Sequence, residues 1–154
     1  MLDRLCRYIH TRNFMTLNDP LNWLFLNISP IATLRGKYYG SFFAEMLQQT
    51  GLDPHRVVIE IVENPIPDQN MLLETVNYYR NIGCLIALDD FGAGQSNFER
   101  VWMADPDIVK LDRSMIVKAS EQKKIRDLLP GIVSLLHQAG CLVVTEGIET
   151  KSRQ

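Results

Sequence analysis

The stretch C-L-I-A-L-D-D-F-G-A-G, residues 84–94, decides the fold prediction for this chain. Its apolar run from Cys84 to Leu88 is typical of a strand that is covered on both faces, as in a parallel sheet under helices. The run ends at two adjacent acids, Asp89 and Asp90, and the glycines that follow predict a loop that a ligand can approach closely. A buried strand that brings carboxylates to its carboxyl end, followed by a loop, is typical of the active sites of α/β barrels.

The rest of the chain repeats this alternation of strand and helix. Further strands are predicted at 23–26, 57–62, 108–111 and 142–144, and helices at 2–12, 34–49, 68–82 and 96–103. A long helix is predicted to begin at Ser120 and to be kinked or split by Pro130. The alternation predicts βα units on one parallel sheet, and five units are fewer than a (β/α)₈ barrel needs. We therefore expect an α/β fold, an incomplete TIM-like barrel.

Composition excludes several classes of partner. The 154 residues carry a net charge of −2, which provides no field for binding polymeric nucleic acid or anionic lipid non-specifically. No apolar run approaches 18 residues, so we expect no direct membrane contact from this segment. The three cysteines are not spaced as metal or redox pairs, which favours a reducing, cytoplasmic compartment.

Polar side chains lie in or directly after every predicted strand. They are Asn27, Glu60 with Glu63, Asp89 with Asp90, Lys110 with Asp112, and Glu146. Because the carboxyl ends of parallel barrel strands share one face, these groups should converge. Two carboxylates about 4 Å apart repel by roughly 4 kcal/mol at an effective dielectric near 20, so several together should take up protons or bind cations. Oxygen ligands with one amide favour hard ions, Mg²⁺ or Mn²⁺.

Each of these residues also has a purely structural interpretation. An acid after a strand is often a turn residue or a helix cap when it is considered alone. The same pattern at five strand ends favours a shared site instead. Lys110 strengthens this interpretation, because a lysine inside an apolar strand needs a carboxylate partner.

The assembled segments resemble the EAL domain of bacterial cyclic di-GMP phosphodiesterases. The resemblance covers roughly residues 20 to 150, and its segments are N-I-S-P (27–30), E-I-V-E (60–63), D-D-F-G-A-G (89–94), D-I-V-K-L-D-R-S (107–114) and E-G-I-E-T (146–150). It implies a modified (β/α)₈ barrel that hydrolyses cyclic di-GMP to linear pGpG with two Mg²⁺ or Mn²⁺ ions. Asn27, Glu60 and Asp89 are implied as ligands of one ion, and Asp90 as a ligand of the second, with Asp89 as a candidate bridge.

The resemblance also implies roles for residues beside the metal ligands. Lys110 is implied to orient the attacking water, and Glu146 to act as a metal ligand or as the general base. Glu63 is implied to anchor the loop after Asp90 through Ser96.

The chain departs from the family pattern in ways that leave two functions open. The Glu-Ala-Leu motif is absent, and we expect it and its strand before Met1 and the last barrel strand beyond Gln154, so that residues 1–154 form one partial EAL domain. Gln95, Asn97 and Thr145 replace the usual tyrosine, serine and alanine.

The first hypothesis is that the chain is part of a phosphodiesterase and that this part is inactive alone. The second is a non-catalytic module that binds cyclic di-GMP or a protein partner. A barrel open at one side favours self-association, so a homodimer is expected.

Overall fold

The computed structural model describes residues 2–28, 42–61, 69–93 and 98–148, and its five described strands form one parallel sheet. The strands are β1 (Leu24–Ile28), β2 (Val57–Ile61), β3 (Leu85–Phe91), β4 (Ile108–Leu111) and β5 (Leu142–Thr145). Each strand pairs in parallel with the next one along the chain. A barrel winds in this single direction, whereas a doubly wound sheet reverses its strand order at a switch point. The expected α/β fold is therefore confirmed, as an incomplete barrel within the described residues.

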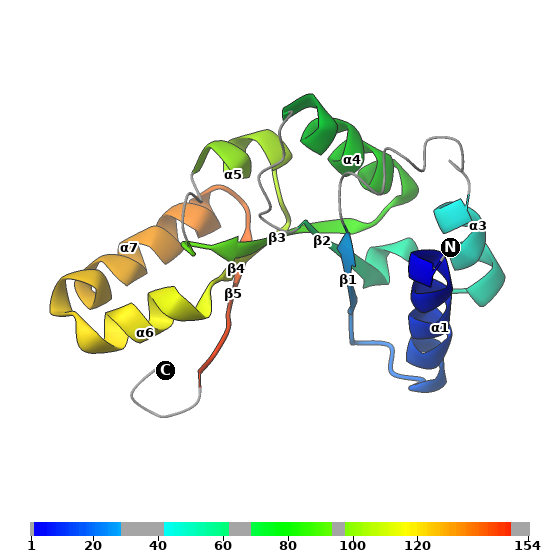
Figure 1. Cartoon of the computed structure of the whole chain (residues 1–154), viewed down its shortest axis with the longest axis horizontal. Helices are drawn as coiled ribbons and strands as arrows, with labels where there is room; N and C mark the ends of the chain where they lie inside the picture. The colour runs from blue at the N-terminus through cyan, green and yellow to red at the C-terminus, as the bar shows by residue number, and fades with distance from the viewer. Residues whose placement is uncertain (1, 29–41, 62–68, 94–97, 149–154) are drawn as a thin grey trace.

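Helices cover one side of this sheet. They are α1 (Leu2–Thr16), α3 (Phe42–Thr50), the short 3₁₀ helix η2 (Pro54–Arg56), α4 (Gln69–Ile82), α5 (Phe98–Ala104), α6 (Arg113–Glu121) and α7 (Lys123–Gln138). Figure 1 shows them as an arch, with α1 and α3 at one end, α4 and α5 over the middle, and α6 and α7 at the other end. No described helix lies over the inner side of the sheet in this view.

The strands are apolar on both faces in the middle of the sheet, as the unbroken apolar run predicted. Every residue of β2 is buried. On the outer face Val57, Ile59 and Ile61 belong to the core that the sheet forms with α3 and α4. On the inner face Val58 packs in a smaller cluster with Ala87 and Ile108, partly covered by Leu85. Two-sided burial holds these strands in one register, because a one-residue slip would move polar residues into the outer core.

The helices at the end of the chain were predicted only in part. The helix expected from Ser120 is α7, which begins at Lys123, and the helix before it, α6, was not predicted. Ser120 lies inside α6, where its hydroxyl donates to the carbonyl of Val117 at 2.7 Å, so it caps nothing. The cap of α6 is Asp112, whose carboxylate accepts from the backbone N–H of Ser114 at 2.8 Å.

Pro130 does not split the second helix. It lies inside α7, which runs from Lys123 to Gln138. A proline leaves one backbone carbonyl of the preceding turn without its helical donor, and that group can turn to water because this face is exposed.

The remaining elements agree with their predicted positions to within a few residues. The predicted starts at 34–41, Asp68 and Ser96 lie outside the described residues. Within the described ranges no helix combines the length and the apolar character needed to cross a bilayer.

Candidate functional site

Two polar residues lie side by side near the carboxyl ends of β1 and β2. Asn27 is the register partner of Glu60, and both lie on the inner face because their neighbours along each strand point into the outer core. Glu60 is only 5% exposed. A buried carboxylate needs a compensating charge or hydrogen bonds, so its surroundings decide its state.

Asp89 and Asp90 occupy a bulge in β3. Leu88 pairs with Val109 of β4 and Phe91 pairs with Leu111, so the two acids lie opposite the single residue Lys110. A bulge of this kind bends the strand and changes the direction of its side chains. Asp90 takes the left-handed backbone conformation, with φ of 57°. The pattern of two acids before glycine predicted a strand end here, but not the bulge.

Lys110 brings three carboxylates together. Its Nζ lies 2.6 Å from Glu60 Oε1, 2.9 Å from Asp89 Oδ1 and 2.7 Å from Glu146 Oε1. Glu146 follows β5 directly, and its N–H donates to the Leu111 carbonyl at 3.3 Å. Lys110 therefore has the carboxylate partners that a lysine in an apolar strand requires. We call Glu60, Asp89, Glu146 and Lys110 the rim cluster.

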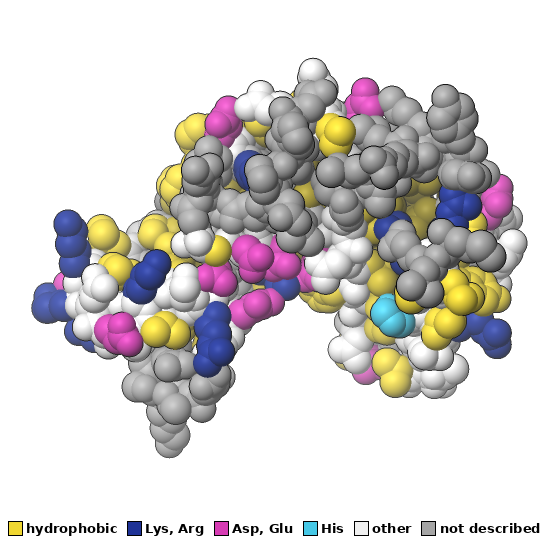
Figure 2. Space-filling view, in the orientation of Figure 1, with side chains coloured by type: hydrophobic (Ala, Val, Ile, Leu, Met, Phe, Trp, Pro, Cys, Tyr) yellow, Lys and Arg dark blue, Asp and Glu magenta, His cyan; other side chains and the backbone are white. Residues whose placement is uncertain are grey.

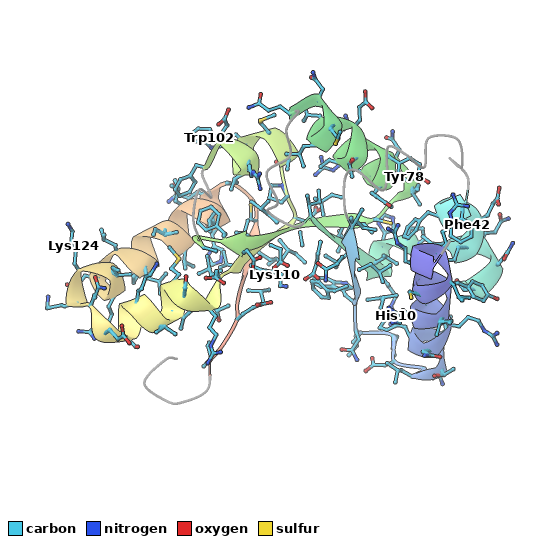
Figure 3. The ribbon with its side chains drawn as sticks, in the orientation of Figure 1. His10, Phe42, Tyr78, Trp102, Lys110 and Lys124 are labelled. Carbon is cyan, nitrogen blue, oxygen red and sulfur yellow. The ribbon has the colours of Figure 1, made fainter. Side chains whose placement is uncertain are left out.

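The rim cluster lies on the open side of the sheet. Figure 3 places Lys110 near the middle of the arch, on the side away from α4 and α5. Figure 2 shows acidic side chains gathered in the same central region of the visible face. This is the side of the sheet on which barrel enzymes build their sites, at the strand ends.

Charge and burial shift two pKa values in this region. Burial lowers the pKa of Lys110, but its hydrogen bonds to Glu146, Glu60 and Asp89 outweigh that effect and raise the pKa above its ordinary value. Lys110 therefore stays charged at neutral pH. The pKa of Asp90 is raised by burial and then by the negative charges of Asp89, Asp112 and Glu146. An extra positive charge beside Asp90 would relieve this repulsion.

Two further contacts lie beside the site. The sequence indicated the first, at Asp112, but not the second, between Arg113 and Gly147. Asp112 is a helix cap, the structural role open to any acid after a strand. The other contact is between Arg113 and Gly147: a Cβ built on Gly147 would collide with Arg113 Cγ. The Arg113 stem thus packs on the turn that immediately follows Glu146. In the sequence, the glycine after Glu146 was the feature that could have indicated this close contact.

The donor chemistry of this region suits a hard divalent cation. Carboxylates from three strand ends converge, and the Asn27 amide lies beside Glu60. Such oxygen donors are the ligands of Mg²⁺ and Mn²⁺. In the described part of the chain, however, no three His, Cys, Asp or Glu side chains are arranged to hold a metal ion. The carboxylates surround the Lys110 ammonium instead.

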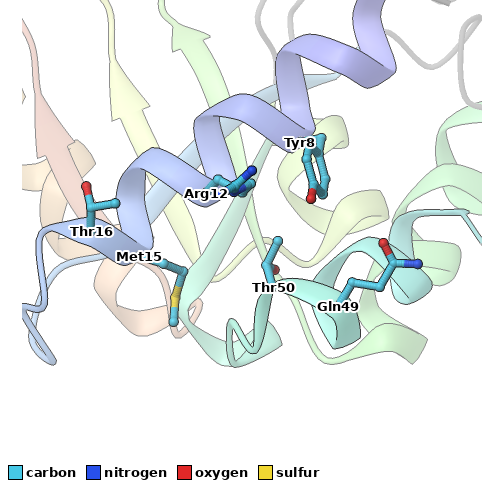
Figure 4. Close-up of a pocket in the computed structure, with 6 residues that line it drawn as sticks. All are labelled: Tyr8, Arg12, Met15, Thr16, Gln49 and Thr50. Carbon is cyan, nitrogen blue, oxygen red and sulfur yellow. The ribbon is translucent and has the colours of Figure 1, made fainter.

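The other predicted site residues, Glu63 and Ser96, lie outside the described residues, as do Gln95 and Asn97. A pocket of about 300 Å³ lies between α1 and α3 and contains no residue of the rim cluster. It is lined by Tyr8, Arg12, Met15, Thr16, Gln49 and Thr50 (Figure 4). Its exposed, mixed lining carries no catalytic group of the kind found at the rim.

A parallel sheet wound in one direction, with carboxylates collected at its carboxyl edge, defines the class of (β/α) barrel proteins whose site lies at that rim. Residues 1–153 match the EAL domain, so the chain belongs to the EAL domain family. The match includes α1, which lies before the motifs that carried the resemblance from about residue 20.

Curated relatives and solved structures agree with this assignment. An uncharacterized protein of Azorhizobium caulinodans is 33% identical over 111 residues, 69% of this chain and 15% of the relative. The cyclic di-GMP phosphodiesterase RocR of Pseudomonas aeruginosa is 30% identical over 144 residues, 93% of this chain and 36% of RocR. The chain thus spans well under half the length of these relatives.

Two solved structures share the fold. The Klebsiella pneumoniae BlrP1 complex with manganese and cyclic di-GMP superposes with a TM-score of 0.89 at 23% identity, over 98% of this chain and 39% of that chain. A standalone EAL protein from Vibrio cholerae with cyclic di-GMP bound has a TM-score of 0.78 at 21% identity, over 99% of this chain and 64% of that chain. At this identity the likeness is one of fold.

Proposed function

We propose that this chain is part of a phosphodiesterase domain that hydrolyses cyclic di-GMP to linear pGpG. The observation that carries the proposal is the convergence of Glu60, Asp89 and Glu146 on Lys110 at the carboxyl edge of a parallel sheet. Membership of the EAL domain family supports it, because the relative RocR is named a cyclic di-GMP phosphodiesterase. BlrP1 supports the choice of ligand, since its structure is titled as a complex with that nucleotide.

The metal roles that we propose are those that membership of the EAL domain family implies. Asn27, Glu60 and Asp89 come from three neighbouring strands and would hold one divalent cation, Mg²⁺ or Mn²⁺. Asp90, next to Asp89 in the bulge, would ligate a second cation, with Asp89 shared between them. The manganese in the BlrP1 complex supports a divalent cation. When bound, two such ions activate water and stabilise charge on the phosphodiester oxygens.

The remaining side chains of the proposed site would accept a proton, orient the water or hold the loop after Asp90. Lys110 would donate a hydrogen bond that orients the attacking water, a role that its raised pKa suits. Glu146, the most exposed member of the rim cluster, would ligate a cation or accept the proton of that water. Glu63 would hold the loop after Asp90 through Ser96.

We further propose that residues 1–154 are one partial EAL domain with little hydrolytic activity alone. The reason is that the sequence contains no Glu-Ala-Leu tripeptide, whose glutamate would complete the cation site. We also propose a cytoplasmic location, which three unpaired cysteines support because such thiols persist in reducing compartments.

A second candidate function rests on the Lys110 ion pairs. A non-catalytic module that binds cyclic di-GMP or a protein partner needs no cation, and Lys110 already supplies a positive charge to the carboxylates. This alternative predicts nucleotide binding without turnover.

The deciding experiment measures pGpG formation from cyclic di-GMP with Mn²⁺ or Mg²⁺, for the full natural protein and for this chain. We expect turnover by the natural protein and a loss of about 100-fold or more in Glu146→Ala, the scale on which single groups stabilising a transition state act. Glu121→Ala, at an exposed position in α6, is the matched control and should keep full activity. Nucleotide binding by calorimetry without any pGpG would establish the non-catalytic module instead.

A further inference from the structure

Lys110 occupies the centre of the carboxylates to which the proposed function assigns a cation. Its partners come from three parts of the chain: Glu60 from β2, Asp89 from β3, and Glu146 from the residue after β5. All three nitrogen-to-oxygen distances lie between 2.6 and 2.9 Å. Distances this short are those of charge-assisted hydrogen bonds.

Burial makes this arrangement a strong one. The exposed fractions are 13% for the Lys110 side chain, 7% for Glu60 and 14% for Asp89, with Glu146 at 45%. Surface ion pairs contribute little to the free energy of unfolding. Removing one partner of a buried pair, however, destabilises the protein because it leaves the other charge uncompensated. Without the ammonium, Glu60 and Asp89 would lose the cation that they share.

One ammonium does not balance three carboxylates. The excess negative charge, to which Asp90 adds, still favours a cation of higher charge. Mg²⁺ binds carboxylate oxygens at about 2.1 Å, and one oxygen of each of these three carboxylates already contacts Nζ. The ammonium and the ion therefore compete for the same oxygens.

We infer that Lys110 is a built-in placeholder cation: its ammonium holds Glu60, Asp89 and Glu146 together in the metal-free protein, and a divalent ion must displace it to gain these ligands. The inference rests on the cation site of the proposed function. It implies that metal-free folding does not depend on the ion and that metal affinity is reduced by the competition. The displaced ammonium stays within reach of the site, where it can donate to a water or a phosphate oxygen.

Two variants and one control test the placeholder. Lys110→Met removes the charge while keeping a long apolar stem, and Lys110→Arg keeps a charge. Lys123→Met is the matched control, because Lys123 also pairs with a carboxylate, Asp127 at 2.7 Å, but in an exposed pair within α7. Calorimetry with Mn²⁺ measures the affinity of this chain, and urea unfolding in EDTA measures its metal-free stability.

The competition should appear as opposite changes in the two measurements. We expect Lys110→Met to bind Mn²⁺ about tenfold more tightly. In this variant no ammonium has to be displaced from the carboxylates before the ion binds. Its metal-free urea midpoint should fall. Lys110→Arg should bind no more tightly than the wild type, and Lys123→Met should match the wild type in both measurements.

Other results would overturn the inference in distinguishable ways. Unchanged or weaker Mn²⁺ binding by Lys110→Met would remove the placeholder role and leave the proposed function standing. Absence of Mn²⁺ binding in every protein would remove the cation site and the inference together. If Lys110→Met is unfolded in EDTA, refolding by Mn²⁺, followed by circular dichroism, supports the inference, and failure to refold contradicts it.

Discussion

Gly147 shows how a single residue positions the rim cluster. It follows Glu146 and adopts a positive φ of 72°, and the Arg113 side chain packs where a Cβ would lie. Both the backbone conformation and the contact therefore require glycine. The orientation of Glu146 depends on this turn, because the residue lies between the end of β5 and Gly147.

Gly147→Ala should destabilise the protein more than a substitution with equal backbone strain. Gly51→Ala is the matched control, since Gly51 has a φ of 71° but nothing within 4 Å of an added Cβ. A left-handed alanine costs about 1–2 kcal/mol, so Gly51→Ala should lose that amount and Gly147→Ala distinctly more in urea unfolding. Combining Gly147→Ala with Arg113→Ala should recover the difference. Equal losses of unfolding free energy in the two single variants would mean that the Arg113 contact does not affect stability.

The three cysteines should differ sharply in reactivity. Cys6 is exposed, whereas Cys84 and Cys141 are buried. Burial raises the pKa of Cys84 to about 12, and burial followed by the charges of Asp105 and Asp107 raises that of Cys141. The thiolate is the reactive form, so at pH 8 the folded protein should be alkylated by iodoacetamide at Cys6 alone.

Mass spectrometry of peptides after timed alkylation checks this expectation. All three sites should react in urea, which controls for the reagent. Labelling of Cys84 in the folded protein at the rate of Cys6 would contradict its burial beneath the helices.

At the scale of elements, the junction of α6 and α7 is set by local contacts and not by the proline. The Gln122 N–H closes the last turn of α6 by donating to the Lys118 carbonyl at 2.8 Å, and the extended backbone of Gln122 then ends the helix before α7 begins at Lys123. Pro130 is tolerated inside α7 because it lies on an exposed part of the helix.

Pro130→Ala should therefore stabilise the protein. An interior proline costs a helix about 3 kcal/mol relative to alanine, so we expect a gain of about 1–3 kcal/mol in urea unfolding. Gly131→Ala is a useful comparison: an added Cβ there meets nothing within 4 Å, and the expected gain is about 0.5–1 kcal/mol. A neutral or destabilising Pro130→Ala would indicate that the proline ring contributes to packing between α7 and its surroundings.

At the scale of the whole molecule, the sheet is open. Among the described strands β1 and β5 lie at its two edges, each paired on one side only. The inner face carries exposed apolar side chains near these edges: Phe25 is 38% exposed, Leu142 53% and Val144 39%. Unpaired strand edges with apolar neighbours favour association.

The chain in isolation should accordingly form a homodimer or larger assembly, which multi-angle light scattering measures directly. Leu142→Lys places a charge at the β5 edge and should shift the distribution toward the monomer. Leu128→Lys, at an exposed position of α7, adds the same charge away from the inner face and should leave the distribution unchanged. A monomeric wild type at micromolar concentration would contradict this expectation.

Much of the fold follows from local sequence patterns. Apolar strands of four to seven residues, acids at their ends and amphipathic helices between them placed all five strands within a few residues of their positions in the structure. These features are local because strand burial and helix faces depend on the period of apolar residues. The need of Lys110 for a carboxylate partner was equally readable, since an unpaired charge in an apolar strand is costly.

The tertiary structure decided which groups meet. The sequence did not reveal that two acids would face Lys110 across a bulge, or that Lys110 would bind Glu60, Asp89 and Glu146 together. The sequence pattern also predicted a helix start at Ser120 and a kink or split at Pro130, and it missed α6 and the end of that helix before Gln122. The physical reason is that register shifts and shared ion pairs arise from the packing of neighbouring strands, which no window of the sequence contains.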